Sequence, residues 1–184
     1  MEYVYYTDGA ATMLKKDNKY IREAGGWAFI KLIDGEITER VTGGCSLTTN
    51  NEMELYAIYA SLLNFQENAE ENDTIEIYSD SGYCINIFTN WIKNWRKNNW
   101  KNSKNKTIEN KDLIQSMDKL IQKINDKYSN VQFRKVKGHS KNQLNQMVDN
   151  LAVEAKKTSK ITQKTIGYKN EDKILGKKMN WLKL

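Results

Sequence analysis

The sequence contains no proline, one histidine and only two cysteines in 184 residues. Cys45 and Cys84 lack metal-ligand spacing and are too few for a disulfide framework, so we expect buried free thiols in a reducing compartment. No apolar run approaches the roughly 18 residues that cross a bilayer, and the first residues lack a signal-peptide pattern. We therefore expect a soluble cytoplasmic protein that makes no membrane contact.

Composition is otherwise ordinary for one globular domain, with 39% hydrophobic and 28% charged residues. The net charge of +6, however, is unevenly distributed. Residues 91–111 hold seven Lys or Arg and one acidic residue, residues 156–184 hold nine and two, and the remainder carries a net charge of −7. A basic stretch alone is usually a solvated face, but this pattern suits a protein that holds phosphates at its edge and metal at its centre.

The first part of the chain predicts three antiparallel strands. Residues 2–8 alternate in polarity and form a strand candidate that ends on Asp8. Residues 26–33 and 36–42 are two further candidates, joined by an Asp-Gly pair that is typical of a tight hairpin. The polar residues 11–24 between them are expected to form a loop.

A helix is predicted over residues 50–66, because apolar residues there repeat at spacings of three and four. These residues are Leu55, Ile58, Leu62 and Phe65. Thr49 and Glu52 have the spacing of a capping box, which gives Glu52 a structural role at the helix start. Glu54 has no such role and lies beside the apolar stripe, where it either points at the sheet or is an ordinary solvent-facing glutamate.

Two acidic residues in the second half follow the same logic. Residues 74–78 predict a short strand that is closed by Asp80, although Asp80 could equally be the N-cap of the next helix. Asp149 lies in the first turns of a helix predicted over 146–157. A helix over 111–128 and a strand over 130–136 complete the core.

If the strands pair as predicted, these four carboxylates (Asp8, Glu54, Asp80 and Asp149) converge. Clustered carboxylates repel one another and are tolerated mainly when a divalent cation neutralises them. Oxygen ligands without thiolates favour Mg²⁺ over zinc. His139, the one histidine, is by itself more typical of a surface or structural residue, but beside such a cluster it becomes a candidate proton shuttle.

Aromatic residues alternate with cations between residues 83 and 101. Trp91 and Trp95 share one helix face and by themselves indicate packing. The surrounding cations predict a phosphate-binding ridge with the aromatic stems beneath it. These cations are Lys93, Arg96, Lys97 and Lys101.

Five short strings, in this order, resemble the motifs of type 1 ribonuclease H, the ribonuclease HI family. They are Thr7-Asp8-Gly9, Thr48-Thr49-Asn50-Asn51 with Met53-Glu54-Leu55, Ser79-Asp80-Ser81, Val136-Lys137-Gly138-His139, and Asp149-Asn150-Leu151-Ala152. The resemblance covers residues 2 to about 157 and predicts a catalytic domain over 1–157. Residues 158–184 are then a basic C-terminal tail, partly docked or flexible.

The resemblance implies an α/β ribonuclease H-like fold: a five-stranded mixed sheet, three antiparallel strands first, flanked by helices. It implies an endonuclease that hydrolyses the RNA strand of RNA/DNA hybrids by a two-metal-ion mechanism, with Mg²⁺ (Mn²⁺ being possible). Asp8, Glu54, Asp80 and Asp149 would be the metal ligands, and His139 would assist the water or product release.

The same resemblance implies the substrate contacts. Thr49 would seat a DNA phosphate, and Asn50 and Asn51 would lie along the minor groove. The basic protrusion of the family would comprise Trp91, Lys93, Trp95, Arg96, Lys97 and Lys101. Residues 11–24 depart from the pattern, because the family has a short turn there, and Gly82 replaces a larger polar residue.

Other functions remain open from the sequence. A DNA nuclease of the same general fold, such as a junction resolvase, also uses clustered acids, and a non-catalytic nucleic-acid-binding module would share the basic regions. The C-terminal domain of a reverse transcriptase looks alike, although a start at Met1 just before the first strand favours a free-standing enzyme. A monomer is expected.

Overall fold

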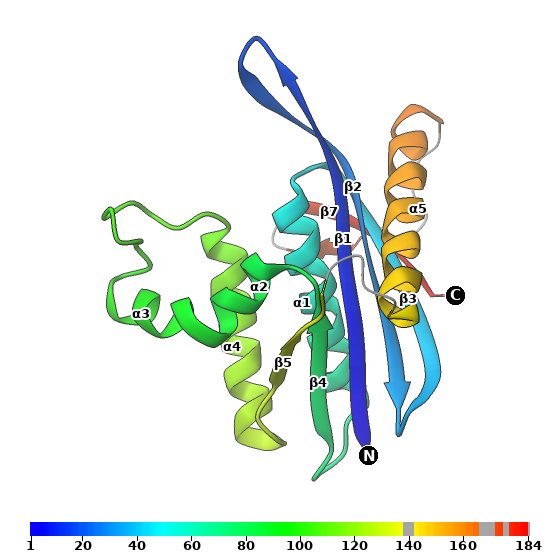
Figure 1. Cartoon of the computed structure of the whole chain (residues 1–184), viewed down its shortest axis with the longest axis vertical. Helices are drawn as coiled ribbons and strands as arrows, with labels where there is room; N and C mark the ends of the chain where they lie inside the picture. The colour runs from blue at the N-terminus through cyan, green and yellow to red at the C-terminus, as the bar shows by residue number, and fades with distance from the viewer. Residues whose placement is uncertain (138–141, 166–171, 175–176, 184) are drawn as a thin grey trace.

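The computed structural model describes residues 1–137, 142–165, 172–174 and 177–183 of the chain. Its centre is the predicted five-stranded mixed sheet, in the order β3-β2-β1-β4-β5 (Figure 1). β1 pairs antiparallel with β2, and β2 with β3, whereas β4 runs parallel to both β1 and β5. The strands span β1 (Glu2–Lys16), β2 (Lys19–Ile33), β3 (Glu36–Thr48), β4 (Thr74–Ser79) and β5 (Gln132–Lys135).

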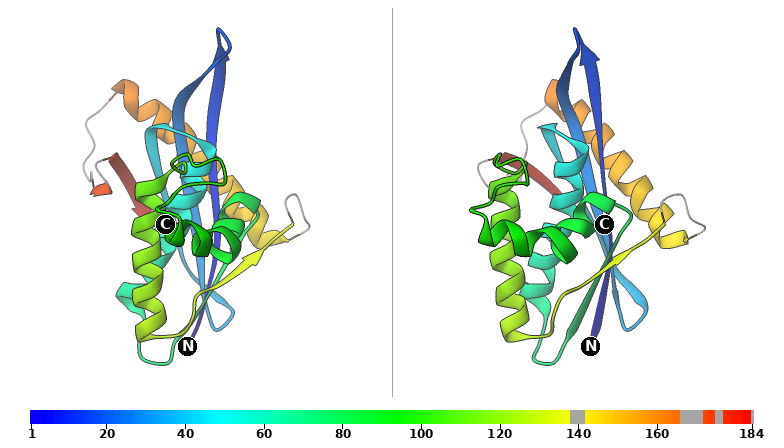
Figure 2. Two further views of the ribbon diagram at one scale, coloured as in Figure 1. Left: turned by 90° about the vertical axis from the view of Figure 1, so that its left-hand side faces the viewer. Right: turned by 60° about the vertical axis from the view of Figure 1, so that its left-hand side comes forward.

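Helices cover both faces of this sheet (Figure 2), and the central strands β1 and β2 alternate between the two apolar environments that result. Tyr3 and Tyr5 of β1 belong to the larger core, which they share with α1 (Asn50–Asn68) and α4 (Lys111–Lys127). Val4 and Tyr6 point to the opposite face, where α5 (Gln143–Thr165) packs. Within the described residues, no helix has the length and apolarity required to span a membrane.

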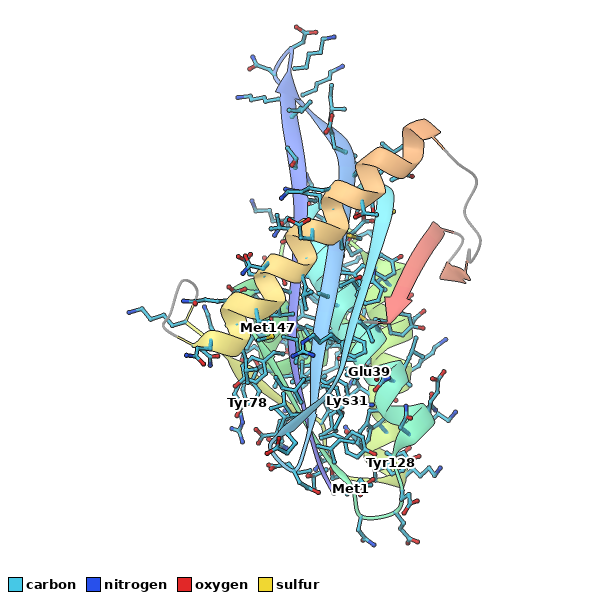
Figure 3. The ribbon with its side chains drawn as sticks, turned by 90° about the vertical axis from the view of Figure 1, so that its right-hand side faces the viewer. Met1, Lys31, Glu39, Tyr78, Tyr128 and Met147 are labelled. Carbon is cyan, nitrogen blue, oxygen red and sulfur yellow. The ribbon has the colours of Figure 1, made fainter. Side chains whose placement is uncertain are left out.

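A buried polar chain joins the sheet to α1. Lys31 of β2 and Glu39 of β3 point toward one another, with 2.9 Å between Nζ and Oε2 (Figure 3). Asn64 of α1 donates to the same carboxylate at 2.9 Å and accepts from the Tyr5 hydroxyl at 2.9 Å. Because each polar group has a partner, the lysine is buried without an unpaired charge.

The loop predicted over residues 11–24 is wrong. These residues extend β1 and β2 into a long hairpin that projects beyond the rest of the sheet; we call residues 11–24 the arm (Figures 1 and 2). Its two-residue turn, Asp17-Asn18, has φ values of 50° and 59°, the left-handed conformation of type I′ hairpin turns. Both residue types tolerate that conformation, so the turn forms without glycine.

The segment after β4 is divided into three short helical pieces. They follow one another without a break and are α2 (Gly82–Asn86), the π-helix η1 (Ile87–Trp91) and α3 (Ile92–Lys97). Figure 1 shows this segment and the following loop protruding to one side of the sheet. It carries the basic region that was predicted from the sequence.

The C-terminal part is more regular than the sequence suggests. α5 continues past the predicted helix end at residue 157 and stops at Thr165. β7 (Lys177–Lys183) then pairs antiparallel with β3, and β6 (Asp172–Ile174) pairs with β7, which extends the sheet to seven strands. The predicted domain boundary thus falls inside a helix.

Candidate active site

Two parallel strands and one helix bring three of the predicted acids together. Thr7 of β1 is the register partner of Ser79 of β4, so the next residues, Asp8 and Asp80, lie side by side where β4 ends, while β1 continues past Asp8 to Lys16. Glu54 reaches them from the second turn of α1. One carboxylate oxygen from each of the three lies within 4.8 Å of the others.

The structure excludes the alternative roles that the sequence left open for two of these acids. Asp80 is not a helix cap, because Ser81 is the N-cap of α2 and accepts from the Cys84 amide at 3.3 Å. Glu54 is not solvent-facing, since only 5% of it is exposed. Glu52 has the structural role: its carboxylate accepts from the Thr48 hydroxyl at 2.8 Å, and Thr49 caps the helix.

The cluster is electrostatically costly in the absence of a cation. Burial, and then the charge of Asp80, raise the pKa of Asp8 from 3.8 to about 7, although a hydrogen bond from the Gly9 backbone partly offsets this. Burial, and then the charges of Asp8 and Asp80, also raise the pKa of Glu54. These shifts mean that the fold concentrates negative charge where water cannot screen it.

The donor set fits a hard divalent cation. Glu54 Oε2 is buried and has no hydrogen-bond partner among the described residues. An unpaired buried carboxylate oxygen is unfavourable unless something else satisfies it. Carboxylate oxygens are the ligands that Mg²⁺ and Mn²⁺ prefer, and neither Cys45 nor Cys84 belongs to the cluster.

Of the other two predicted catalytic residues, Asp149 and His139, the structure describes only Asp149. Asp149 is an exposed residue of α5 and lies close enough to Asp8 to raise its pKa. α5 is held tightly against the sheet, since a Cβ on Gly26 of β2 would lie 2.2 Å from the Lys156 nitrogen. His139 lies outside the described residues.

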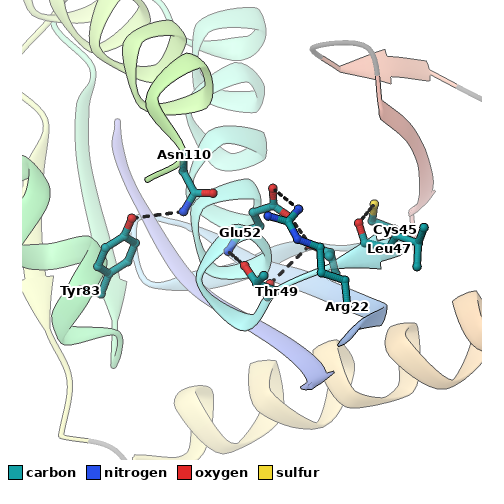
Figure 4. A network of polar contacts seen from close by, with 8 residues as sticks. Arg22, Cys45, Leu47, Thr49, Glu52, Tyr83 and Asn110 are labelled. Carbon is teal, nitrogen blue, oxygen red and sulfur yellow. Dashed lines mark hydrogen bonds and ion pairs between the residues drawn. The ribbon is translucent and has the colours of Figure 1, made fainter. Parts of the chain in front are cut away.

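The predicted substrate residues Thr49, Asn50 and Asn51 line an open cleft of about 520 Å³. Its other walls come from Met13 and Arg22 of the arm, and from Glu109 and Asn110 before α4. Figure 4 shows the polar contacts around it: Arg22 lies 3.4 Å from a Glu52 carboxylate oxygen, and Asn110 donates to the Tyr83 hydroxyl at 3.2 Å.

The residues predicted to form the basic ridge differ in their solvent exposure and in their ion pairing. Lys93 and Lys97 are exposed, Lys101 is half-buried, and Trp91 packs on Trp95 with 5.7 Å between ring centroids. Arg96, by contrast, makes a two-pronged contact to the buried carboxylate of Asp118. Its guanidinium therefore anchors α3 to α4.

Sequence reasoning missed residues that the fold adds to the site. Asn145, 5% exposed, donates to Asp80 Oδ2 at 3.4 Å. It precedes Asp149 by four residues, so the helical repeat could have placed the two on one face. Met13 and Arg22 carried no comparable signal, because they fell in the segment expected to be a loop.

Comparison with known proteins agrees with this geometry. The RNase H family model matches residues 1–157. Ribonuclease H from Chlorobium chlorochromatii is 40% identical over 156 residues, covering 84% of this chain and 95% of that protein. Ribonuclease H from Clostridium botulinum is 39% identical over 153 residues, covering 83% and 93%.

Solved structures share the fold. LC9-RNase H1, a type 1 RNase H, superposes with a TM-score of 0.68 at 22% identity, over 86% of this chain and 73% of that one. LC11-RNase H1, determined in complex with an RNA/DNA hybrid, gives a TM-score of 0.57 at 16% identity, over 85% and 98%. The match over residues 1–157 and the identity to curated relatives show that the chain belongs to the ribonuclease H family.

Proposed function

We propose that this protein is a metal-dependent endoribonuclease that hydrolyses the RNA strand of RNA/DNA hybrids. The observation that carries the proposal is the convergence of Asp8, Glu54 and Asp80 within 4.8 Å, where β4 ends beside the middle of β1. Membership of the ribonuclease H family supports the reaction, and the cleft at the start of α1, the helix that also carries Glu54, supports an extended substrate.

The metal site we propose takes two Mg²⁺ ions, with Mn²⁺ as a substitute, on Asp8, Glu54, Asp80 and Asp149. When bound, two such ions activate a water molecule and stabilise the charge that develops at the phosphate. The unpaired Oε2 of Glu54 and the raised pKa values of Asp8 and Glu54 support this site, because a cation would relieve both.

The chain's own residues then bind and orient the duplex. Thr49 lies at the N-terminus of α1, where helix amides and the helix dipole favour a phosphate. Asn50 and Asn51 offer side-chain amides along the same cleft, suited to the minor groove. Selectivity for RNA would come from 2′-hydroxyl contacts and groove shape.

Further residues complete the proposal. Lys93, Lys97 and Lys101 supply cations for the DNA strand, beside the exposed ring of Trp91 that packs on Trp95, and Arg96 supports them through Asp118. His139 moves a proton or assists product release. We further propose a monomer with its catalytic unit in residues 1–157 and a cytoplasmic location, which the free thiols of Cys45 and Cys84 suit.

A cleavage panel tests the proposal. With Mg²⁺, the protein should cleave an RNA/DNA hybrid but leave duplex RNA, duplex DNA and a four-way junction intact. Asp80→Asn should abolish cleavage while hybrid binding persists. Asp73→Asn is the matched control: Asp73 is also buried, but it precedes β4 and pairs with the Met1 amino group, at the opposite end of the strand from Asp80.

Two results would overturn the proposal. Cleavage of the junction but not the hybrid would indicate a DNA nuclease of the same fold. Tight hybrid binding without cleavage in any divalent cation would indicate a binding module.

A further inference from the structure

Two residues of the arm line the substrate cleft, but most of the arm extends beyond that cleft and has no role in the site described above. Met13 and Arg22 are cross-strand register partners, and both line the cleft with Thr49, Asn50 and Asn51. Register partners in an antiparallel pair point to the same side of the sheet. The cleft therefore continues from the start of α1 onto the arm.

The two faces of the arm differ in what they offer. Side chains two residues apart in a strand share a face, so Lys15 lies on the α1-facing side with Met13. The opposite side carries Leu14 and its partner Ile21, which are 49% and 42% exposed, and beyond them Lys16 and its partner Lys19. Each face thus combines apolar and basic groups, but only the first is continuous with the cleft.

The basic side chains of the arm can bind phosphates. The ion pairs found among the described residues involve none of Lys15, Lys16 and Lys19. Arg22 is paired with Glu52 but remains 54% exposed, and its charge offsets that of a carboxylate which would otherwise repel a phosphate beside α1. The arm carries four basic residues and two acidic ones within residues 11–24.

The length of the arm matches a stretch of duplex. From Ala11 to Lys16, six strand residues extend roughly 20 Å at about 3.3 Å each. This distance corresponds to about six base pairs at roughly 3.4 Å per pair. The arm is therefore long enough to contact about six base pairs of a duplex that extends along it from Thr49–Asn51.

We propose that the α1-facing side of the arm, Met13, Lys15 and Arg22, is an additional binding surface for the RNA/DNA hybrid, which continues the cleft at the start of α1 and contacts phosphates farther along the duplex. This inference rests on the proposed function, since it assigns the same substrate. Charge complementarity and continuity with the cleft favour a nucleic acid over a protein partner on this face. The length of the arm then determines how many base pairs of the hybrid the enzyme contacts.

The test compares one charge on each face. One phosphate contact is worth roughly eightfold in affinity at about 0.1 M salt, and its loss lowers the salt dependence by about one charge. Lys15→Gln should accordingly raise KM about five- to tenfold for a hybrid of about 20 base pairs, with kcat unchanged. Lys19→Gln removes the same charge from the other face and should leave KM within about twofold.

Hybrid length and arm length provide the second comparison. A hybrid of about 10 base pairs, placed so that it ends at the cleft, should be cleaved equally by all variants. Replacing residues 14–21 with Asn-Gly, a turn that suits the Met13–Arg22 pair, should reproduce the Lys15→Gln defect on the long hybrid without lowering kcat on the short one.

Failures of the two proposals are distinguishable. If the unaltered protein cleaves no hybrid, the proposed function fails and this inference with it. If it cleaves hybrids but Lys15→Gln and Lys19→Gln act alike, or the shortened arm keeps its KM on the long hybrid, only the inference is overturned. A larger effect from Leu14→Ser with Ile21→Ser would also overturn it, and would indicate an apolar partner on the opposite face.

Discussion

Gly9 of β1 lies directly against the backbone of Glu54, so closely that a Cβ on Gly9 would come within 2.2 Å of the Glu54 nitrogen and 2.4 Å of the Met53 carbonyl carbon. No side chain fits between the strand and the helix at this point. This contact fixes the distance between α1 and β1 and thereby the position of Glu54 relative to Asp8, the neighbour of Gly9. The geometry of the carboxylate cluster therefore depends on Gly9, although Gly9 has no side chain of its own.

Gly9→Ala should consequently damage stability and activity together. The new methyl group must push α1 away from β1, an overpacking that typically costs about 1–3 kcal/mol. Thermal unfolding and kcat on a hybrid measure the two effects. Gly82→Ala is the control, because its Cβ would meet only the flexible Lys135 ammonium at 3.1 Å; it should change neither by much. A Gly9→Ala protein with normal kcat would show that the close contact is dispensable.

Asp8→Asn should stabilise the metal-free protein while abolishing cleavage. The pKa of Asp8 is raised in the fold from 3.8 to about 7, so between these values the folded state binds more protons than the unfolded state. Stability in a chelator should therefore fall as pH rises through that range, and Asp8→Asn should flatten the fall. At pH 7.5 we expect Tm to rise by at least about 3 °C, the shift that roughly 1 kcal/mol produces in a chain of this size.

Adding Mg²⁺ tests whether the higher Tm of Asp8→Asn comes from reduced repulsion among the clustered carboxylates. The cation should raise the Tm of the unaltered protein and have little effect on Asp8→Asn. Equal Mg²⁺ responses in both proteins would contradict the assignment of Asp8 as a ligand.

Thr49→Ala tests whether one side chain serves both capping and binding. Its hydroxyl accepts from the Glu52 amide at 3.2 Å, and losing such a cap costs about 1 kcal/mol. We expect a lower Tm and a higher KM, with Thr49→Ser restoring both. A change in KM at constant Tm would mean that the cap contributes nothing to stability.

Arg96 should behave differently from its basic neighbours. Arg96→Ala leaves the buried carboxylate of Asp118 with the Gln122 side-chain amide, at 3.0 Å, as its remaining side-chain partner among the described residues, and should cost about 1–3 kcal/mol of stability. Lys97→Ala removes an exposed cation and should raise KM without changing Tm. Chemical denaturation measures the loss of stability, and steady-state kinetics measures the change in KM. Identical effects of the two substitutions would contradict a structural role for Arg96 and a binding role for Lys97.

Much of the site was accessible from the sequence, because its geometry follows from local patterns. Asp8 and Asp80 each follow a strand-like pattern in the sequence, and parallel pairing of β1 with β4 then places them side by side, although β1 itself continues past Asp8. Glu54 could be separated from Glu52 because Thr49 marks the helix start. The family prediction and the five-stranded sheet are both confirmed.

What escaped prediction depends on contacts between distant residues. The arm has few buried residues, so its strands lack the apolar alternation that identifies a half-buried strand; they are specified by pairing and by the Asp17-Asn18 turn. Arg96 looked like its neighbouring cations, because the sequence does not reveal that Asp118, 22 residues later, lies opposite it. Likewise, nothing local indicated that β7 would join β3.

The pairing of β7 with β3 has a consequence for solubility. Without it, β3 from Val41 to Gly44 would present unpaired amides and carbonyls along an open margin, a surface on which strands of other molecules can add. β7 occupies that margin, and the strand left outermost, β6, is only three residues long and begins with Asp172 and Lys173. The C-terminal segment therefore acts as a built-in guard against edge-to-edge aggregation.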